Sequence, residues 1–190
     1  MANDTVLNTP VLWINKYLQD KIPLLTDVDV PFFPSSPTSI DDLTETFPNG
    51  DSMATWDRLI KMNRRGFPHI KCEQLLYYFY ATGSDPIGTM VKIQEAVLRL
   101  MDRYDETAEE INNWCANRQV QLDDGSLVDN IFHFHNFKVY QLEETRDIID
   151  FGTARTYGGN KIIIDYDYHQ TAGINSPEWV PENLATKIVI

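Results

Sequence analysis

The first periodic run of apolar residues predicts a helix that begins after Thr9. Apolar side chains recur at three- and four-residue spacing from Leu12 to Ile22, which is typical of a helix with one buried face. Thr9 can cap this helix, and Pro10 suits its first position because the missing N–H would have no helical partner there. Proline cannot donate a hydrogen bond inside a helix, so we expect Pro23 to end it.

The segment that follows, residues 23–50, is rich in proline. Within it, VDVPFF predicts a short edge strand, since proline cannot donate to a central ladder. The remainder, PSSPTSIDDLTETFPNGD, predicts a long surface arm, and such long segments in compact domains are usually functional or disordered. We expect the arm to reach a neighbouring molecule, with these contact residues at its base: Pro31, Phe32, Phe33 and Pro34.

The strongest strand pattern is FPHIKCEQLLYYFYATG, at residues 67–83. One face of this strand carries Ile70, Cys72, Leu76, Tyr78 and Tyr80. The other face begins with Lys71 and Glu73 and continues with Leu75, Tyr77 and Phe79. We therefore expect a central strand whose first half is exposed on one side and whose second half is covered on both.

Two helices are predicted next. Asp85 and Pro86 suit the cap and first residue of a helix that ends near Tyr104. Its apolar face, at three- and four-residue spacing, consists of Ile87, Met90, Val91, Val97, Leu98 and Met101. Asp105 is expected to cap a second helix, which is followed by a polar loop at 121–130.

The last third of the chain alternates between apolar and polar residues as strands do. Strands are predicted at 131–142, in RDIIDFG at 146–152 and in KIIIDYDYH at 161–169. In the last of these we assign one face to the core: Ile162, Ile164, Tyr166 and Tyr168. The opposite face, which we assign to solvent, a lumen or a partner, carries Lys161, Ile163, Asp165, Asp167 and His169.

Together these elements predict one α+β domain over residues 1–169. Its mainly antiparallel sheet is packed by the N-terminal helix and the long central helix. A proline-rich arm at about 23–50, a helical insertion at about 105–130 and a C-terminal extension at 170–190 complete the expected organisation.

Charge and composition narrow the possible functions. The net charge is −12, from 28 acidic and 16 basic residues, and this balance disfavours nucleic-acid or anionic-lipid binding, which needs clustered cations. The polar N-terminus does not resemble a signal peptide, and no apolar run is long enough to span a bilayer. We expect a soluble protein with Cys72 and Cys115 reduced and packed as inert thiols.

The stretch GTARTYGGNK resembles a glycine-rich phosphate loop only superficially. Such a loop needs Gly-Lys followed by Ser or Thr at the start of a helix, whereas here Asn160 precedes Lys161 and a strand pattern follows. We predict instead a tight hairpin turn at Gly158-Gly159, where a positive φ costs little. This hairpin is expected to present a charged face for partner contact, formed by Arg155, Tyr157, Lys161, Asp165 and Asp167.

Metal chemistry is an alternative that rests on His133 and His135. Alternation places both imidazoles on one strand face, and His169, Asp165 or Asp167 on a paired strand could complete a site. A second motif at metal-ligand spacing does not occur, and pairs of acidic residues are better explained as solvated loop charge. We therefore expect no catalytic residue, no cofactor and no bound metal.

The order of these elements resembles the tail-terminator family of tailed bacteriophages, and more narrowly the tail-completion and sheath-stabilising proteins of contractile-tailed phages. The resemblance rests on TPVLWINKYLQDKIP, the proline-rich arm, HIKCEQLLYYFYATG, DPIGTMVKIQEAVLRLMDRYDE and VYQLEETRDIIDFGTARTYGGNKIIIDYDYH, and it covers roughly residues 9–169. Residues 106–130 and the tail after Gln170 exceed the minimal pattern of that family.

This resemblance implies a structural virion protein rather than an enzyme. Such a protein forms a homo-oligomeric ring, most often a hexamer, which caps the tail tube and sheath and joins the tail to the connector proteins of the head and neck. It implies assembly in the host cytoplasm, a final location in the virion neck, no membrane and no specific nucleic-acid binding, although DNA passes through the ring. Another neck component, such as a head-completion or connector adaptor protein, and a metal-dependent enzyme remain alternatives.

Overall fold

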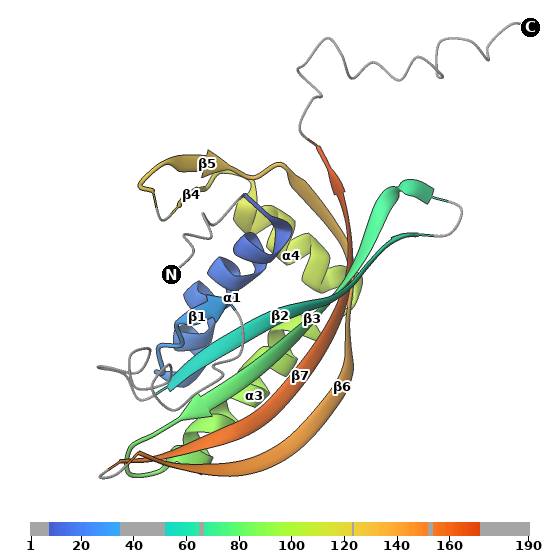
Figure 1. The fold of residues 1–190 in the computed structure, drawn as a ribbon. Coiled ribbons are helices and arrows are strands. Elements are labelled where there is room, and N and C mark those ends of the chain that lie inside the picture. Colours follow the sequence, from blue (N-terminus) through green and yellow to red (C-terminus); the bar gives the residue numbers. More distant parts are fainter. Residues whose placement is uncertain (1–7, 35–51, 65–66, 123, 152–153, 172–190) are drawn as a thin grey trace, which may run out of the picture.

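The chain folds as an α+β protein in which three helices pack on a mainly antiparallel sheet (Figure 1). The computed structural model describes residues 8–34, 52–64, 67–122, 124–151 and 154–171. The helices are α1 (Pro10–Thr26), α3 (Pro86–Met101) and α4 (Asp105–Cys115). The strands are β1 (Phe32–Pro34), β2 (Ser52–Arg64), β3 (Phe67–Ala81), β4 (Gln119–Gln121), β5 (Leu127–Asp129), β6 (Phe132–Phe151) and β7 (Ala154–Gln170).

The main sheet has five strands in the order β1-β2-β3-β7-β6. Only β1 and β2 run parallel, and the other neighbours are antiparallel. The predicted central strand is therefore central, with β2 on one side and β7 on the other. Strands β4 and β5 form a separate small hairpin beside α1 and α4 (Figure 1), within residues predicted to be a loop.

The main core lies between the helices and one face of the sheet. Alternate residues of β3 and β7 point into it, together with the buried faces of all three helices. Its largest fully buried side chains include Trp13, Tyr17, Tyr77, Phe79, Phe134, Phe137 and Tyr166. The predicted core face of the last strand is confirmed, since Ile162, Ile164, Tyr166 and Tyr168 are all buried. Consecutive residues are also buried where both faces of the sheet are covered, as at Leu75, Leu76 and Tyr77.

Helix α1 begins as predicted but ends later. The Thr9 hydroxyl caps it by accepting from the Leu12 N–H at 3.4 Å. Pro23 lies inside the helix, which continues to Thr26 and ends at Asp27 in the left-handed conformation, with φ 59°. A proline removes one N–H donor but still offers its carbonyl, and that of Pro23 accepts from the Asp27 N–H at 2.9 Å.

The two later helices also begin within a residue of their predicted starts. Asp85 caps α3 by accepting from the Gly88 N–H at 3.0 Å. Ile87 and Val91, which were assigned to the apolar face, are instead exposed. The buried face of the helix is the adjacent one and does not include these two residues. Asp105 is the first residue of α4 rather than its cap, and Tyr104 holds the cap position with φ 51°.

The C-terminal sheet differs most from the prediction. The two strands expected at 131–142 and 146–152 form the single strand β6. Its pairing with β7 contains three register shifts, and the ladder continues beyond each of them. The predicted turn at Gly158-Gly159 is wrong, because both glycines lie within β7. The last described pair of the β6–β7 ladder joins Phe151 to Ala154. Gly159 instead marks a bulge, since Asn160 and Gly158 pair with the consecutive residues Phe79 and Tyr80.

Two more sequence expectations are changed by neighbouring strands. Residues 52–64, to which we assigned no element, form β2 and cover the whole length of β3. Glu73, which was assigned to an exposed face, is buried with 2% of its surface accessible. The predicted strand VDVPFF is confirmed in part as β1, at the edge of the sheet. Most of the predicted arm and of the C-terminal extension, residues 35–51 and 172–190, lies outside the described residues.

A buried hydrogen bond between the central strand and α1 gives a first test of this packing. The Tyr77 hydroxyl donates to the Asn15 side-chain oxygen at 2.6 Å. Burial raises the pKa of Tyr77 well above its ordinary value, which keeps this donor protonated. We expect Tyr77→Phe to lower the free energy of unfolding by about 1–2 kcal/mol, because the buried Asn15 amide loses a partner. Urea denaturation measures this loss, and the exposed Tyr104→Phe should leave stability unchanged.

Candidate functional site

All four histidines of the chain gather at one end of the sheet. His133 and His135 belong to β6, His169 to β7 and His69 to β3. Ring centroids lie 5.2 Å apart for His133 and His135, and 5.2 Å and 5.0 Å from these two to His169. The ring of His69 lies 6.4 Å from that of His169. We call these four residues the histidine cluster.

Strand alternation places His133 and His169 on the face of the sheet opposite the helices. His133 and His169 pair directly across the ladder, and their neighbours Phe134 and Tyr168 point into the core. A register shift between Phe134 and Phe137 turns His135 to the same side as His169. The Nε2 atom of His135 and the Nδ1 atom of His169 are 2.8 Å apart, so the N–H of one ring donates a hydrogen bond to the nitrogen of the other.

This environment favours the neutral form of His169. Its pKa lies below the ordinary value, first because the ring is partly buried and then because His135, His133 and His69 would repel a charge on it. The hydrogen bond to His135 acts in the same direction, because two doubly protonated rings have only donors to offer each other.

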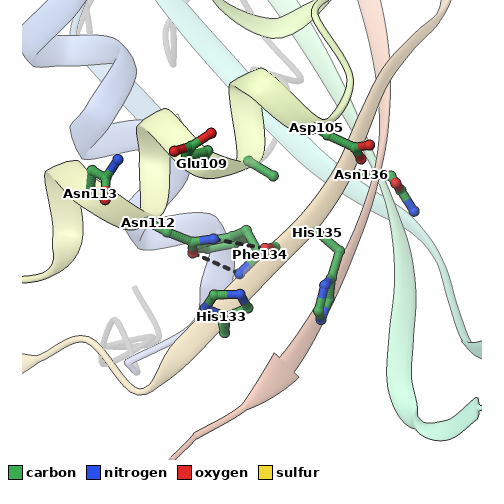
Figure 2. Close-up of a pocket in the computed structure, with 9 residues that line it drawn as sticks. Asp105, Glu109, Asn112, Asn113, His133, Phe134, His135 and Asn136 are labelled. Carbon is green, nitrogen blue, oxygen red and sulfur yellow. Dashed lines mark hydrogen bonds between the residues drawn. The ribbon is translucent and has the colours of Figure 1, made fainter.

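A shallow depression of about 420 Å³ lies between α4 and the start of β6. Two carboxylates of the helix, on Asp105 and Glu109, line it together with His133 and His135 (Figure 2). Asn112 joins the two elements. Its amide nitrogen donates to the Phe134 carbonyl at 2.8 Å, and its oxygen accepts from the Phe134 N–H at 2.9 Å (Figure 2). The amide thus takes the place of a neighbouring strand along this part of β6.

Of the metal ligands that we considered, the structure brings His133, His135 and His169 together, whereas Asp165 and Asp167 are hydrogen-bonded to amide side chains. The Asp165 carboxylate accepts from Gln74 at 2.8 Å, and the Asp167 carboxylate accepts from Asn136 at 2.9 Å. Among the described residues, no group of three or more His, Cys, Asp or Glu side chains is positioned to hold a metal ion.

Several residues predicted to contact a partner are engaged within the chain. Phe32 packs edge-on against Tyr77 with centroids 5.5 Å apart, and Phe33 packs on Met53 and Tyr80. Phe33 and its neighbours Pro31 and Phe32 are half-buried, and the Pro31 carbonyl accepts from the Ala54 N–H at 2.8 Å. Pro34 ends β1 opposite Trp56.

The charged residues assigned to the predicted hairpin are divided along β7. Lys161 lies over the Tyr78 ring, 5.9 Å from its centroid, and is half-buried like Asp165 and Asp167. The backbones of Arg155 and Tyr157 pair with Asp150 and Ile148 near the far end of the β6–β7 hairpin, and their side chains lie outside the described residues. Whether these residues contact a partner stays a prediction.

A buried carboxylate joins three strands on the helix side of the sheet. Glu73 of β3 accepts from the Tyr166 hydroxyl at 2.6 Å and from the Tyr168 hydroxyl at 2.7 Å, both on β7. Arg58 of β2 approaches the same carboxylate at 3.2 Å. The pKa values of both tyrosines are raised, first by burial, so the hydroxyls remain donors. Every oxygen of Glu73 is satisfied, which is the condition for a stable buried charge.

The thiols do not form a reactive site. Cys115 is buried on α4, and burial raises its pKa to about 12, which keeps the thiol protonated and unreactive. Cys72 is half-buried on β3 opposite Asp167. Within the part of the chain that the structure describes, no helix is both long and apolar enough to cross a membrane.

No protein-family model and no curated protein sequence matches the chain.

Sequence reasoning named three of the four histidines of the cluster, since His169 was considered beside His133 and His135, and it missed the glutamate network. The H-x-H spacing identified His133 and His135, but His69 lies far away in the chain and joins only through the order β3-β7-β6. The signal for the network was present in two places: a lone glutamate in the apolar strand of Glu73, and the Y-D-Y pattern that places Tyr166 and Tyr168 on one face. Antiparallel pairing of β3 with β7 was needed to connect them.

The glutamate network predicts a specific loss of stability. We expect Glu73→Gln to lower the free energy of unfolding by about 2–3 kcal/mol, because the amide nitrogen cannot accept from a tyrosine and the Arg58 charge loses its partner. Differential scanning calorimetry measures the change. Glu95→Gln on the exposed side of α3 is the matched control and should be neutral. Equal melting temperatures for the two variants would contradict a structural role for Glu73.

Proposed function

We propose that this protein is a structural component of a phage virion, which forms a ring that caps the tail tube and sheath and joins the tail to the head and neck. The observation that carries the proposal is the long strand β6 at the edge of the sheet. An edge strand offers a row of backbone donors and acceptors to another chain. Subunits joined along such edges form a continuous sheet, which is one way to close a ring.

Asparagine side chains of the same chain already bond the backbone groups at one end of this edge. The Asn130 side chain exchanges hydrogen bonds with the backbone of Phe132, and Asn112 does the same with Phe134. Beyond the bulge at 135–136, no described residue pairs with the outer edge of β6. An unpaired edge of this length is an aggregation hazard unless a partner covers it. We infer that residues 137–151 pair with a second subunit.

The shape and charge of the chain suit this role. Helices cover one face of the sheet (Figure 1), so neighbouring subunits can join edge to edge without disturbing the core. The net charge of −12 suits a ring through which DNA passes, because an acidic surface does not retain the phosphate backbone. The N-terminal helix, the central strand, the long helix and the C-terminal strands on which the family resemblance rests also support the proposal. The protein acts in this proposal as a binding and assembly component, not as an enzyme.

The decisive experiment locates the protein in the assembled particle. We expect mass spectrometry to find it in purified virions, and cryo-electron microscopy to place it as a ring between the head connector and the end of the tail tube. Absence from virions would contradict the proposal, as would a position outside the neck. Density bound to the portal, with no contact to the tube, would replace the tail-capping role with that of a connector adaptor.

Proline substitution tests how the subunits join. N–H groups of an edge strand point alternately toward the sheet and away from it, so either Lys138 or Val139 directs its N–H outward. Proline at the outward position should leave the monomer folded, as judged by circular dichroism, but prevent ring formation on purified tail tubes. Asp165→Pro, in the internal strand β7, is the control and should unfold the protein.

The outcomes of this substitution are separable from those of the virion experiment. If a folded edge-proline variant still forms rings, pairing along β6 is wrong, although the location in the neck can stand. Light scattering of the unmodified protein provides the reference mass, with and without tail tubes present.

A further inference from the structure

The histidine cluster lies where the main sheet is held together by few backbone pairs. Beyond the register shift between Phe134 and Phe137, the end of the β6–β7 ladder consists of three pairs, which join Phe132 to Gln170, His133 to His169 and Phe134 to Tyr168. Three of the four imidazoles belong to these strands at or beside these pairs, and the hydrogen bond between His135 and His169 adds a side-chain link across them.

Charged and titratable groups from each neighbouring element face this region. Strand β3 contributes His69 and Cys72, and β7 contributes Asp167, whose carboxylate is bonded to Asn136. Helix α4 contributes Asp105 and Glu109, which line the depression beside His133 and His135. The groups that act on His169 itself are the three other histidines, and each opposes its protonation.

We propose that the four histidines form a pH-sensitive latch, which is closed while the imidazoles are neutral and is opened by their protonation at mildly acidic pH, releasing the end of β6 from β7. The argument rests on ring separations of 5.0–6.4 Å, at which several positive charges repel one another. Protonation of both rings also removes the acceptor in the bond between His135 and His169. The latch is independent of the proposed place in a virion.

The direction of the pH dependence follows from the preference of the folded state for neutral His169. Because its pKa is lowered in the folded protein from the ordinary value of 6.5, the unfolded chain binds more protons between these two values. Stability is therefore complete above about pH 7, falls as the pH drops below 6.5, and levels off below the folded pKa. Each unit by which the pKa is lowered reduces the ratio of folded to unfolded protein by about tenfold.

Two measurements test the latch in the full chain. Because these are the only four histidines, every imidazole C2 proton seen by NMR belongs to the cluster. We expect at least one to titrate clearly below pH 6.5. Hydrogen exchange should show faster exchange at pH 5.5 than at pH 7.5, after correction for intrinsic rates, for the amides of the directly paired His133 and His169 and of Thr171, which donates to the Ile131 carbonyl at 2.7 Å. The centre of β7 near Ile164 should keep its protection.

Variants separate the latch from general acid sensitivity. Replacement of His133 and His169 by asparagine should flatten the dependence of stability between pH 7.5 and 5.5, whereas Lys138→Gln on the same strand should keep the wild-type slope. If the double variant fails to fold, His69→Asn with His133→Asn removes the two exposed rings and should reduce the slope in part. Ordinary titration of all four rings near pH 6.5, or equal slopes in wild type and variants, would overturn the proposal.

Discussion

The burial of the aromatic face of β3 and β7 beneath three helices is the constraint on which the rest of the structure depends. Tyr77, Phe79 and Tyr166 each remove a large apolar surface from water, and each such side chain contributes about 2–3 kcal/mol when fully buried. This requirement fixes the register of the two central strands, because a slip by one residue would turn the aromatic set to the opposite face. Positions of the remaining strands follow from that register, including the bulges that allow β6 and β7 to remain paired.

Two polar side chains of this core, Asn15 and Glu73, form hydrogen bonds between elements. Asn15 meets the hydroxyl of Tyr77, and Glu73 receives two tyrosine hydroxyls and an arginine. Both arrangements join elements that are distant in the chain, so they add specificity to a core whose apolar contacts are not directional. The histidine cluster on the other face follows the same register, since His133 and His169 meet because their neighbours are buried.

The helix-covered face and the open edge together suggest how such a chain functions. One face is committed to the core, which leaves the edges and the opposite face for contact with other molecules. Asparagine side chains block the first residues of β6, while its later residues offer a backbone edge that suits a second subunit.

Local signals in the sequence determined the helices, the central strand and the buried face of β7. Thr9 with Pro10 and Asp85 with Pro86 mark helix starts through interactions within one turn, and alternation identifies Ile162 and Ile164 as buried without reference to any partner strand. Tertiary structure decided what depends on distant neighbours. It buried Glu73 against the tyrosines of β7, moved the turn away from Gly158-Gly159, extended α1 past Pro23 and gathered four histidines from three strands. The physical reason is that a strand obtains its hydrogen bonds and half of its packing from other strands, so its register and its buried polar groups are set by the sheet as a whole.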